Sequence, residues 1–97
     1  MWTILLHPLV LSEDLKNLDR SIQRKILRVL RKRLTLEPRA YGEPLHAELA
    51  GLWKLRVGDY RVIYRIVEQR VEVLVLKNGI RRDFEVYQQM IQRLRRL

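Results

Sequence analysis

The chain has 97 residues, no cysteine, and a formal net charge of +9 from 20 Lys and Arg against 11 Asp and Glu. This length allows one domain with a single hydrophobic core over residues 1–97, and the missing cysteines exclude disulfides and thiolate metal sites. The basic excess extends through both halves of the sequence and favours a polyanionic partner, nucleic acid ahead of an anionic membrane. The apolar run in residues 1–10 is short and is interrupted by His7 and Pro8, so we expect no signal peptide or membrane span and a cytoplasmic protein.

The N-terminal third of the chain predicts a strand and two helices. Residues 2–6 form a short apolar run that suits a buried strand, and Pro8 suits the first turn of a helix. Leu11, Leu15 and Leu18 recur at helical spacing and predict an amphipathic helix over about residues 8–17. Asp19 is a suitable N-cap for a longer second helix. Its apolar stripe comprises Ile22, Ile26, Val29, Leu30 and Leu34.

The opposite side of this second helix carries only positive charge, because no acidic residue occurs between Arg20 and Leu36. Such a face lacks the oppositely charged partners that stabilise an isolated helix. It is either a solvated surface or a docking surface for RNA phosphates, and the sequence leaves both interpretations open. The residues concerned are Arg20, Arg24, Lys25, Arg28, Arg31 and Lys32.

Three predicted strands follow an irregular segment. Residues 37–51 contain Pro38, Gly42 and Pro44 and predict a loop, whereas alternating runs at residues 53–57, 60–67 and 70–76 predict strands. The Gly-Asp pair at residues 58–59 is typical of a two-residue type II′ hairpin loop, which fixes the register of the first two strands. In that register Arg56 lies opposite Arg61.

This register predicts three cations on one face of the sheet. Because side chains alternate between the two faces of a strand, Lys54, Arg56 and Arg61 share a face. Like charges opposite each other destabilise a sheet, and an anionic ligand would offset that cost. A tight turn at residues 68–69 places Arg65 opposite Glu72, so we assign Arg65 a structural role.

The remaining pattern completes an α+β domain. The second face of the sheet is apolar and is expected to lie under the two helices; its residues are Val62, Tyr64, Ile66, Val71, Val73 and Val75. Residues 84–97 predict a final helix whose apolar stripe is Tyr87, Met90 or Ile91, and Leu94. We therefore expect the order β-α-α-β-β-β-α, with two N-terminal helices packed on a twisted, mainly antiparallel sheet.

The residue pattern excludes several kinds of catalytic site. His7 and His46 have no companions at metal-binding spacing, and the sequence shows no nucleophilic triad, glycine-rich phosphate loop or carboxylate pair, so we expect neither a metal nor a small-molecule cofactor. The cationic strand face suits a phosphodiester, and RNA supplies its own nucleophile, the 2′-OH. Because positive neighbours lower the pKa of a lysine, Lys54 beside Arg56 could act as the base that removes the 2′-OH proton.

The run from Gly51 to Tyr64, GLWKLRVGDYRVIY, resembles the RelE/ParE toxin superfamily. The likeness includes Gly-Glu-Pro-Leu at residues 42–45 and Arg-Arg-x-x-x-Val-Tyr at residues 81–87, and it covers nearly the whole chain. It implies a single RelE-like toxin domain. RelE-like members are mRNA interferases that cut messenger RNA in the ribosomal A site, whereas ParE-like members inhibit DNA gyrase.

The resemblance implies roles for five site residues of the RelE-like branch. Lys54 would activate the 2′-OH, and Arg61 would stabilise charge on the phosphoryl oxygens. Arg81 would act as an acid or a second clamp at the leaving group, and Tyr87 would stack on a base. Arg56 stands where a second lysine is often found; an arginine binds phosphate but does not deprotonate at useful pH.

The resemblance also implies a function and partners. The protein would be the toxin of a type II toxin-antitoxin system, a metal-independent, ribosome-dependent endoribonuclease that halts translation under stress. Its partners would be the ribosome, mRNA and a cognate acidic, RelB-like antitoxin that displaces or blocks the C-terminal helix. Two alternatives stay open: a ParE-like DNA gyrase inhibitor, and a non-catalytic RNA-binding toxin-like module.

Overall fold

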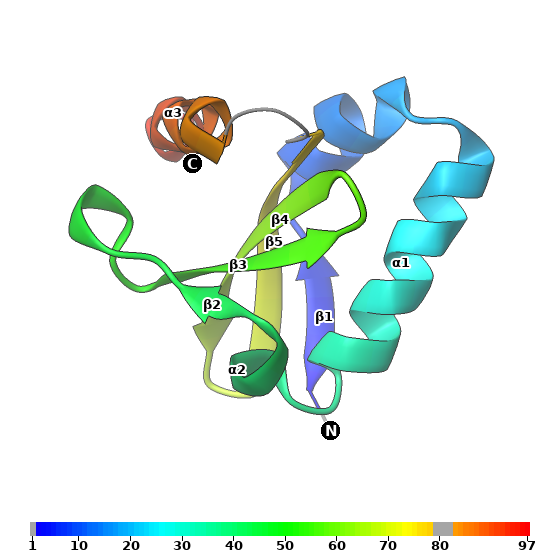
Figure 1. Cartoon of the computed structure of the whole chain (residues 1–97), viewed down its shortest axis with the longest axis horizontal. Helices are drawn as coiled ribbons and strands as arrows, with labels where there is room; N and C mark the ends of the chain where they lie inside the picture. Colours follow the sequence, from blue (N-terminus) through cyan, green and yellow to red (C-terminus); the bar gives the residue numbers. More distant parts are fainter. Residues whose placement is uncertain (1, 79–82) are drawn as a thin grey trace.

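In the described part of the chain, five strands form one sheet in the order β1-β5-β4-β3-β2 (Figure 1). The computed structural model describes residues 2–78 and 83–97. The strands are β1 (Thr3–Leu6), β2 (Glu43–Pro44), β3 (Leu52–Val57), β4 (Tyr60–Val67) and β5 (Arg70–Asn78). β1 runs parallel to β5 and the other neighbouring pairs run antiparallel, which confirms the predicted mainly antiparallel sheet.

Helices cover both faces of the sheet (Figure 1). The long helix α1 (Arg20–Leu34) buries Ile26, Leu30 and Leu34 against the face that carries Val62 and Tyr64, as its 3.6-residue apolar period requires. The C-terminal helix α3 (Asp83–Leu94) lies on the opposite face. The predicted α+β class and the packing of the N-terminal helices on the sheet are confirmed, and α3 adds a layer on the face that carries the strand cations.

Two segments depart from the predicted secondary structure. In place of a regular α-helix over residues 8–17, the chain forms a π-helical turn, η1 (Val10–Asp14), followed by a 3₁₀ turn, η2 (Leu15–Asn17). The predicted loop at residues 37–51 contains the short helix α2 (Pro38–Tyr41), strand β2 and a 3₁₀ turn, η3 (Ala47–Leu49). Both differences are local, because short elements of this kind carry little periodic signal in the sequence.

A β-bulge near the middle of β5 moves Val75 to the α3 face of the sheet. The register with β4 shifts between Ile63 and Tyr64, so that Ile63 pairs with Val75 and Tyr64 pairs with Val73. Leu74 is therefore the extra residue, and both Leu74 and Val75 pack on the α3 side with Ile63. The prediction that Val75 belongs to the face under α1 is wrong, because a bulge interrupts the simple alternation from which it was made.

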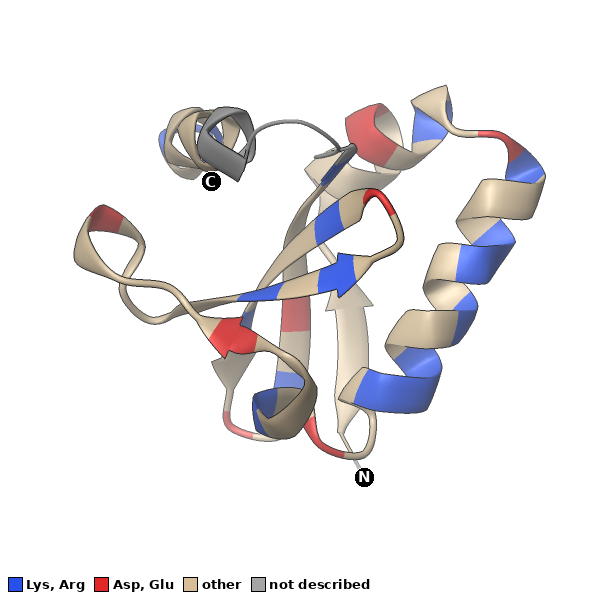
Figure 2. Cartoon of the chain, in the orientation of Figure 1, with Lys and Arg blue, Asp and Glu red and all other residues tan. Residues whose placement is uncertain are grey.

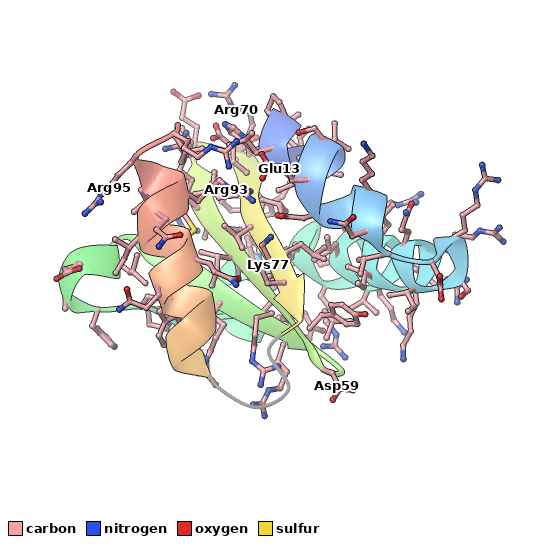
Figure 3. All side chains as sticks on the ribbon, turned by 90° about the horizontal axis from the view of Figure 1, so that it is seen from above. Glu13, Asp59, Arg70, Lys77, Arg93 and Arg95 are labelled. Carbon is pink, nitrogen blue, oxygen red and sulfur yellow. The ribbon has the colours of Figure 1, made fainter. Side chains whose placement is uncertain are left out.

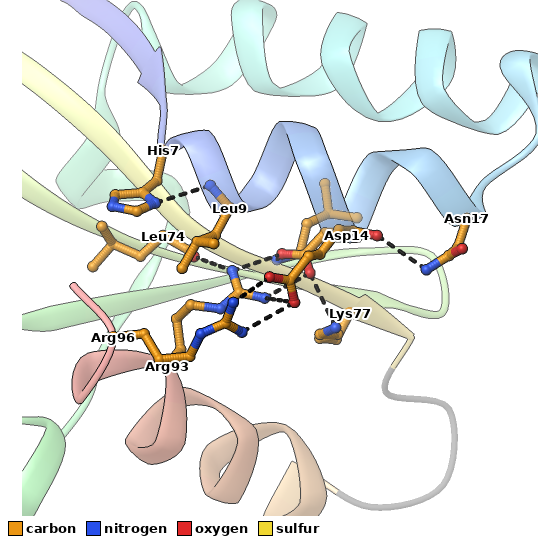
Figure 4. A network of polar contacts seen from close by, with 10 residues as sticks. His7, Leu9, Asp14, Asn17, Leu74, Lys77, Arg93 and Arg96 are labelled. Atoms are coloured by element: carbon orange, nitrogen blue, oxygen red, sulfur yellow. Dashed lines mark hydrogen bonds and ion pairs between the residues drawn. The ribbon is translucent and has the colours of Figure 1, made fainter.

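A buried ion pair joins α3 to η1 (Figure 4). Arg93 donates to both carboxylate oxygens of Asp14, at 2.8 and 3.2 Å, and to the carbonyl oxygen of Leu74 at 3.0 Å. Asp14 also accepts the backbone N–H of Leu76 at 2.9 Å. β1 pairs with β5 only as far as Val73. Beyond that point, Arg93 and Asp14 make hydrogen bonds to the backbone groups of Leu74 and Leu76 at the open edge of β5.

The same ion pair corrects the predicted stripe of the final helix. Met90 is fully buried and Tyr87 and Ile91 pack beside it, as expected. Leu94, however, is 36% exposed, whereas Arg93 is only 4% exposed. The inward-facing position near the end of α3 is therefore Arg93, whose charge is neutralised by the buried carboxylate of Asp14.

Candidate functional site

The hairpin between β3 and β4 has the predicted loop and register. Gly58 has a φ of +59°, while Asp59 is not among the residues with positive φ, which agrees with a type II′ turn. Arg56 pairs with Arg61, and Lys54 pairs with Ile63. Gly58 is needed here because a residue with a Cβ rarely adopts this backbone conformation.

Four cations lie on one face of three neighbouring strands, and we call them the cationic face: Lys54 and Arg56 on β3, Arg61 on β4 and Lys77 on β5. Arg61 pairs with Arg56 on one side and with Lys77 on the other. Figure 2 shows these positive segments near the 57–60 hairpin. The prediction that Lys54, Arg56 and Arg61 share a face is confirmed, and Lys77 joins them because β5 extends to Asn78 rather than ending at residue 76.

These cations differ in exposure and in what holds them. Arg56 is exposed and can meet a ligand directly. Arg61 is 4% exposed, and its Nη1 donates to the carbonyl oxygen of Tyr60 at 3.4 Å. Lys77 Nζ lies 3.0 Å from Asp14 Oδ1, so the buried carboxylate of Asp14 serves both Arg93 and Lys77. Arg61 is thus held in one place while Arg56 can adjust to a ligand.

Lys54 lies between a carboxylate and an aromatic ring. Its Nζ is 3.8 Å from Glu43 Oε2, and the pairing of Glu43 with Lys54 on β2 and β3 sets this contact. The Glu43 side chain is 78% exposed, so water screens the pair and it contributes little to stability. On the other side, Lys54 Nζ lies 5.7 Å from the centroid of the Tyr87 ring, at cation–π distance.

Tyr87 combines a packing contact with a place at the site. It is half-buried and packs against the core cluster that contains Ile63 and Met90, while its ring reaches Lys54. Arg81, the remaining predicted site residue, lies outside the described residues. The described part of the site therefore brings Lys54, Arg56, Arg61 and Tyr87 together.

Among the side chains that the structure describes, no group of three or more His, Asp or Glu is close enough to hold a metal ion. No described helix is long and apolar enough to cross a membrane. The six positive residues predicted on one side of α1 are all exposed. Figure 2 shows positive segments along the length of this helix. The chemistry available on the cationic face is therefore that of Lys, Arg and Tyr side chains, which bind and stabilise phosphate oxygens.

Sequence reasoning missed Asp14, Lys77 and Arg93. Lys77 lies opposite Arg61 only because the bulge at Leu74 shifts the register by one residue, so simple alternation along β5 places it on the other face. Asp14 and Arg93 had no detectable signal, because a contact between residues so far apart in the chain leaves no periodic pattern. All three belong to the cluster that holds α3 beside the cationic face.

Comparison with known proteins places the chain in a family of toxins. The family of the ParE toxin of the type II toxin-antitoxin system, parDE, matches residues 4–82. Toxin RelG of Mycobacterium tuberculosis is 42% identical over 50 residues, which are 52% of this chain. That match spans 58% of the length of RelG.

Solved structures show the same relationship. The toxin-antitoxin complex RelBE2 from M. tuberculosis is similar at 30% identity and a TM-score of 0.74, over 79% of this chain and 96% of the matched chain. The isolated E. coli RelE toxin has a TM-score of 0.67 at 16% identity, over 97% of this chain and 99% of that chain, and it shows the fold alone. The chain belongs to the RelE/ParE superfamily of toxins of type II toxin-antitoxin systems.

Proposed function

We propose that this toxin is a metal-independent endoribonuclease that cuts mRNA in the ribosomal A site and so inhibits translation. The observation that carries the proposal is the cationic face, where Lys54, Arg56 and Arg61 lie together with Tyr87 beside them. A cluster of this kind costs the fold stability through like-charge repulsion. An RNA phosphate would relieve that repulsion.

The proposed reaction uses the nucleophile of the substrate. Lys54 accepts the proton of the 2′-OH, and the 2′ oxygen attacks the adjacent phosphorus. The bond from phosphorus to the 5′ oxygen then breaks, which leaves a 2′,3′-cyclic phosphate and a 5′-hydroxyl end. Arg56 and Arg61 donate N–H groups to the non-bridging oxygens, whose negative charge grows in the transition state.

Two further roles rest on the resemblance to RelE-like toxins. Arg81 is proposed to clamp the leaving 5′ oxygen, which takes its proton from water because an arginine keeps its own. Tyr87 is proposed to stack on a nucleobase of the message. Tyr87 has a supporting contact, since its ring already lies near the Lys54 amine. A nucleobase stacked on Tyr87 would therefore bring the sugar and phosphate of its nucleotide close to Lys54, the proposed proton acceptor.

The proposed partners follow from charge and from the relatives. A formal net charge of +9 suits both ribosomal RNA and an acidic antitoxin. A relative from M. tuberculosis was solved as a toxin-antitoxin complex, and E. coli RelE was solved with a RelB peptide. We propose that a RelB-like antitoxin neutralises this toxin too.

A second function has an observation in its favour. The family that matches residues 4–82 is described by its ParE toxin members, so inhibition of DNA gyrase is the alternative. The two proposals differ in target, and a gyrase inhibitor needs no base or phosphate clamp at Lys54 and Arg61. A non-catalytic RNA-binding module would differ from both in causing no cleavage and no gyrase inhibition.

Primer extension on a translated message tests the proposed function. The wild type is expected to produce A-site cuts, and Arg61→Ala is expected to slow cutting by about 10²–10³-fold, as loss of one transition-state donor does. Arg65→Ala is the matched control, because Arg65 lies on the same strand but pairs with Glu72 at 2.8 Å. Equal cutting by both variants, or gyrase inhibition without cutting, would contradict the proposal.

A further inference from the structure

A pocket of about 230 Å³ lies beside the cationic face at the outer edge of β3. It is lined by Arg33 of α1, Tyr41 of α2, Glu43 of β2, and Lys54, Leu55 and Arg56 of β3. Lys54 and Arg56 therefore serve both the cationic face and the pocket. Three positive side chains face one carboxylate, so the pocket favours an anion.

The edge of β3 is open at this pocket. β2 pairs only with Trp53 and Lys54, so β3 beyond Lys54 has no strand beside it on that side in the described part of the chain. In a two-residue hairpin the pair next to the loop, here Val57 and Tyr60, exchanges hydrogen bonds. Alternation then points the backbone N–H of Arg56 away from β4 and toward the pocket, which adds a donor for a phosphate oxygen.

Tyr41 forms an aromatic platform on the wall of the pocket. It is 51% exposed, which is unusual for a ring that could pack, and the Arg33 guanidinium lies 5.8 Å from its centroid. An exposed ring beside a guanidinium is a surface on which nucleic-acid bases stack, because every base has a π-face. The pocket thus offers a stacking surface and a phosphate site next to each other.

Contacts of the buried Tyr64 with α2 and Gly42 hold Tyr41 in position. The buried Tyr64 hydroxyl donates to the carbonyl oxygen of Pro38 at 2.6 Å, which holds α2 against the sheet. Burial raises the pKa of Tyr64 far above its usual value, so this hydroxyl stays protonated and continues to donate. Gly42 follows Tyr41 directly, and any Cβ at Gly42 would lie 1.8 Å from the Tyr64 hydroxyl oxygen. The chain therefore passes closely over Tyr64 and turns Tyr41 outward.

We infer that this pocket is a second nucleotide site, in which a base of single-stranded RNA stacks on Tyr41 and Arg33 while its phosphate lies on Arg56 and Lys54. The inference rests on the proposed function, since the nucleotide would be a neighbour of the one cut on the cationic face. Tyr64, in the cluster on the α1 face, holds α2 and so Tyr41 on that side of the sheet, whereas Tyr87 packs with the cluster on the α3 face. The two rings therefore receive different bases. Tyr41 and Arg33 act as positioning and specificity residues, because they bind a nucleotide that does not react.

Fluorescence anisotropy with a short, 5′-labelled single-stranded RNA tests the inference without any cleavage. The wild type is expected to bind this RNA more tightly than an abasic RNA of equal length, because only the first offers bases. Tyr41→Ala is expected to weaken binding of the normal RNA by about tenfold, the usual size of one stacking contact, and to leave abasic RNA unchanged. Tyr41→Phe should bind as the wild type does, since stacking needs the ring and not the hydroxyl.

A control and two contrary results complete the test. Leu36→Ala is the matched control, because Leu36 is 58% exposed near the end of α1 but does not line the pocket. Equal weakening of normal and abasic RNA by Tyr41→Ala, or no weakening at all, would overturn the inference. Loss of antitoxin binding with RNA binding intact would instead assign the pocket to a peptide. Because binding is measured without cleavage, loss of cutting in Arg61→Ala reports on the proposed function separately.

Discussion

Arg93→Met removes the guanidinium that joins α3 to η1 and β5. Arg93 is 4% exposed and donates hydrogen bonds to both carboxylate oxygens of Asp14 and to the carbonyl oxygen of Leu74. Breaking a buried ion pair from one side costs about 3–5 kcal/mol, mainly because a charge stays behind without its partner. Here Lys77 remains 3.0 Å from the Asp14 carboxylate, so we expect the lower end, about 3 kcal/mol.

Urea unfolding followed by circular dichroism measures this loss, with the slope against urea unchanged if the unfolded state is unaffected. Arg95→Met is the matched control, because Arg95 is exposed and points away from the cluster (Figure 3); its change should stay within about 0.5 kcal/mol. In a cycle with Asp14→Asn, the two losses should not add, because both variants break the same pair. A loss below about 1 kcal/mol for Arg93→Met, or strict additivity, would refute this reasoning.

Three further predictions follow from individual contacts. Lys54→Ala should slow single-turnover A-site cleavage by about 10²–10⁴-fold. Lys54→Arg should be as slow, because arginine keeps its proton. Cleavage by Lys54→Ala within about tenfold of the wild-type rate would exclude Lys54 as the base. The hydrogen bond from Arg96 lowers the pKa of Glu13 below its usual 4.5. The pair's contribution to the free energy of unfolding should therefore be complete above pH 4.5 and be lost as the pH falls through the lowered pKa. If Glu13→Gln loses stability at acid pH in the same way as the wild type, this prediction is contradicted. Gly42→Ala should cost about 1–3 kcal/mol through its clash with the Tyr64 hydroxyl, and the cost should shrink in a Tyr64→Phe background; equal costs in both backgrounds would contradict the clash.

The strand hairpin could be predicted from the sequence because its determinants are local. The Gly-Asp loop and the alternation around it fix which residues face each other, and Arg56 lies opposite Arg61 as a result. The pairing of Arg65 with Glu72 follows in the same way from the tight turn at Glu68, whose φ is +57°. Short-range sequence patterns therefore predict the part of the site that lies on the β-sheet.

Features that depend on contacts between distant segments could not be predicted. The bulge at Leu74 moves Val75 to the α3 side, and nothing in the continuous apolar run of residues 73–76 marks where an extra residue stands. The Asp14–Arg93 pair joins the first helical segment to the last helix. The hydropathy pattern of the sequence does not reveal this pair, so it does not predict that α3 lies on the cationic face.

The position of Tyr41 shows the same limit at the pocket. Pro38, Gly42 and Pro44 predict an irregular segment, and the structure does contain short elements there. What turns Tyr41 toward the edge of β3 is the hydrogen bond from Tyr64 to Pro38, made across 26 residues of chain. The stacking platform therefore became visible only with the fold.

The proposed chemistry is tested most directly by a message that carries a 2′-deoxy nucleotide on the 5′ side of the scissile phosphate, presented in the A site of a programmed ribosome. Without the 2′-OH the attacking oxygen is missing, while the phosphates that bind the cationic face are unchanged. We predict that the toxin still binds this complex and no longer cuts it, whereas the all-ribose message is cut. Cleavage of the 2′-deoxy message at the same position and a similar rate would contradict attack by the 2′-OH.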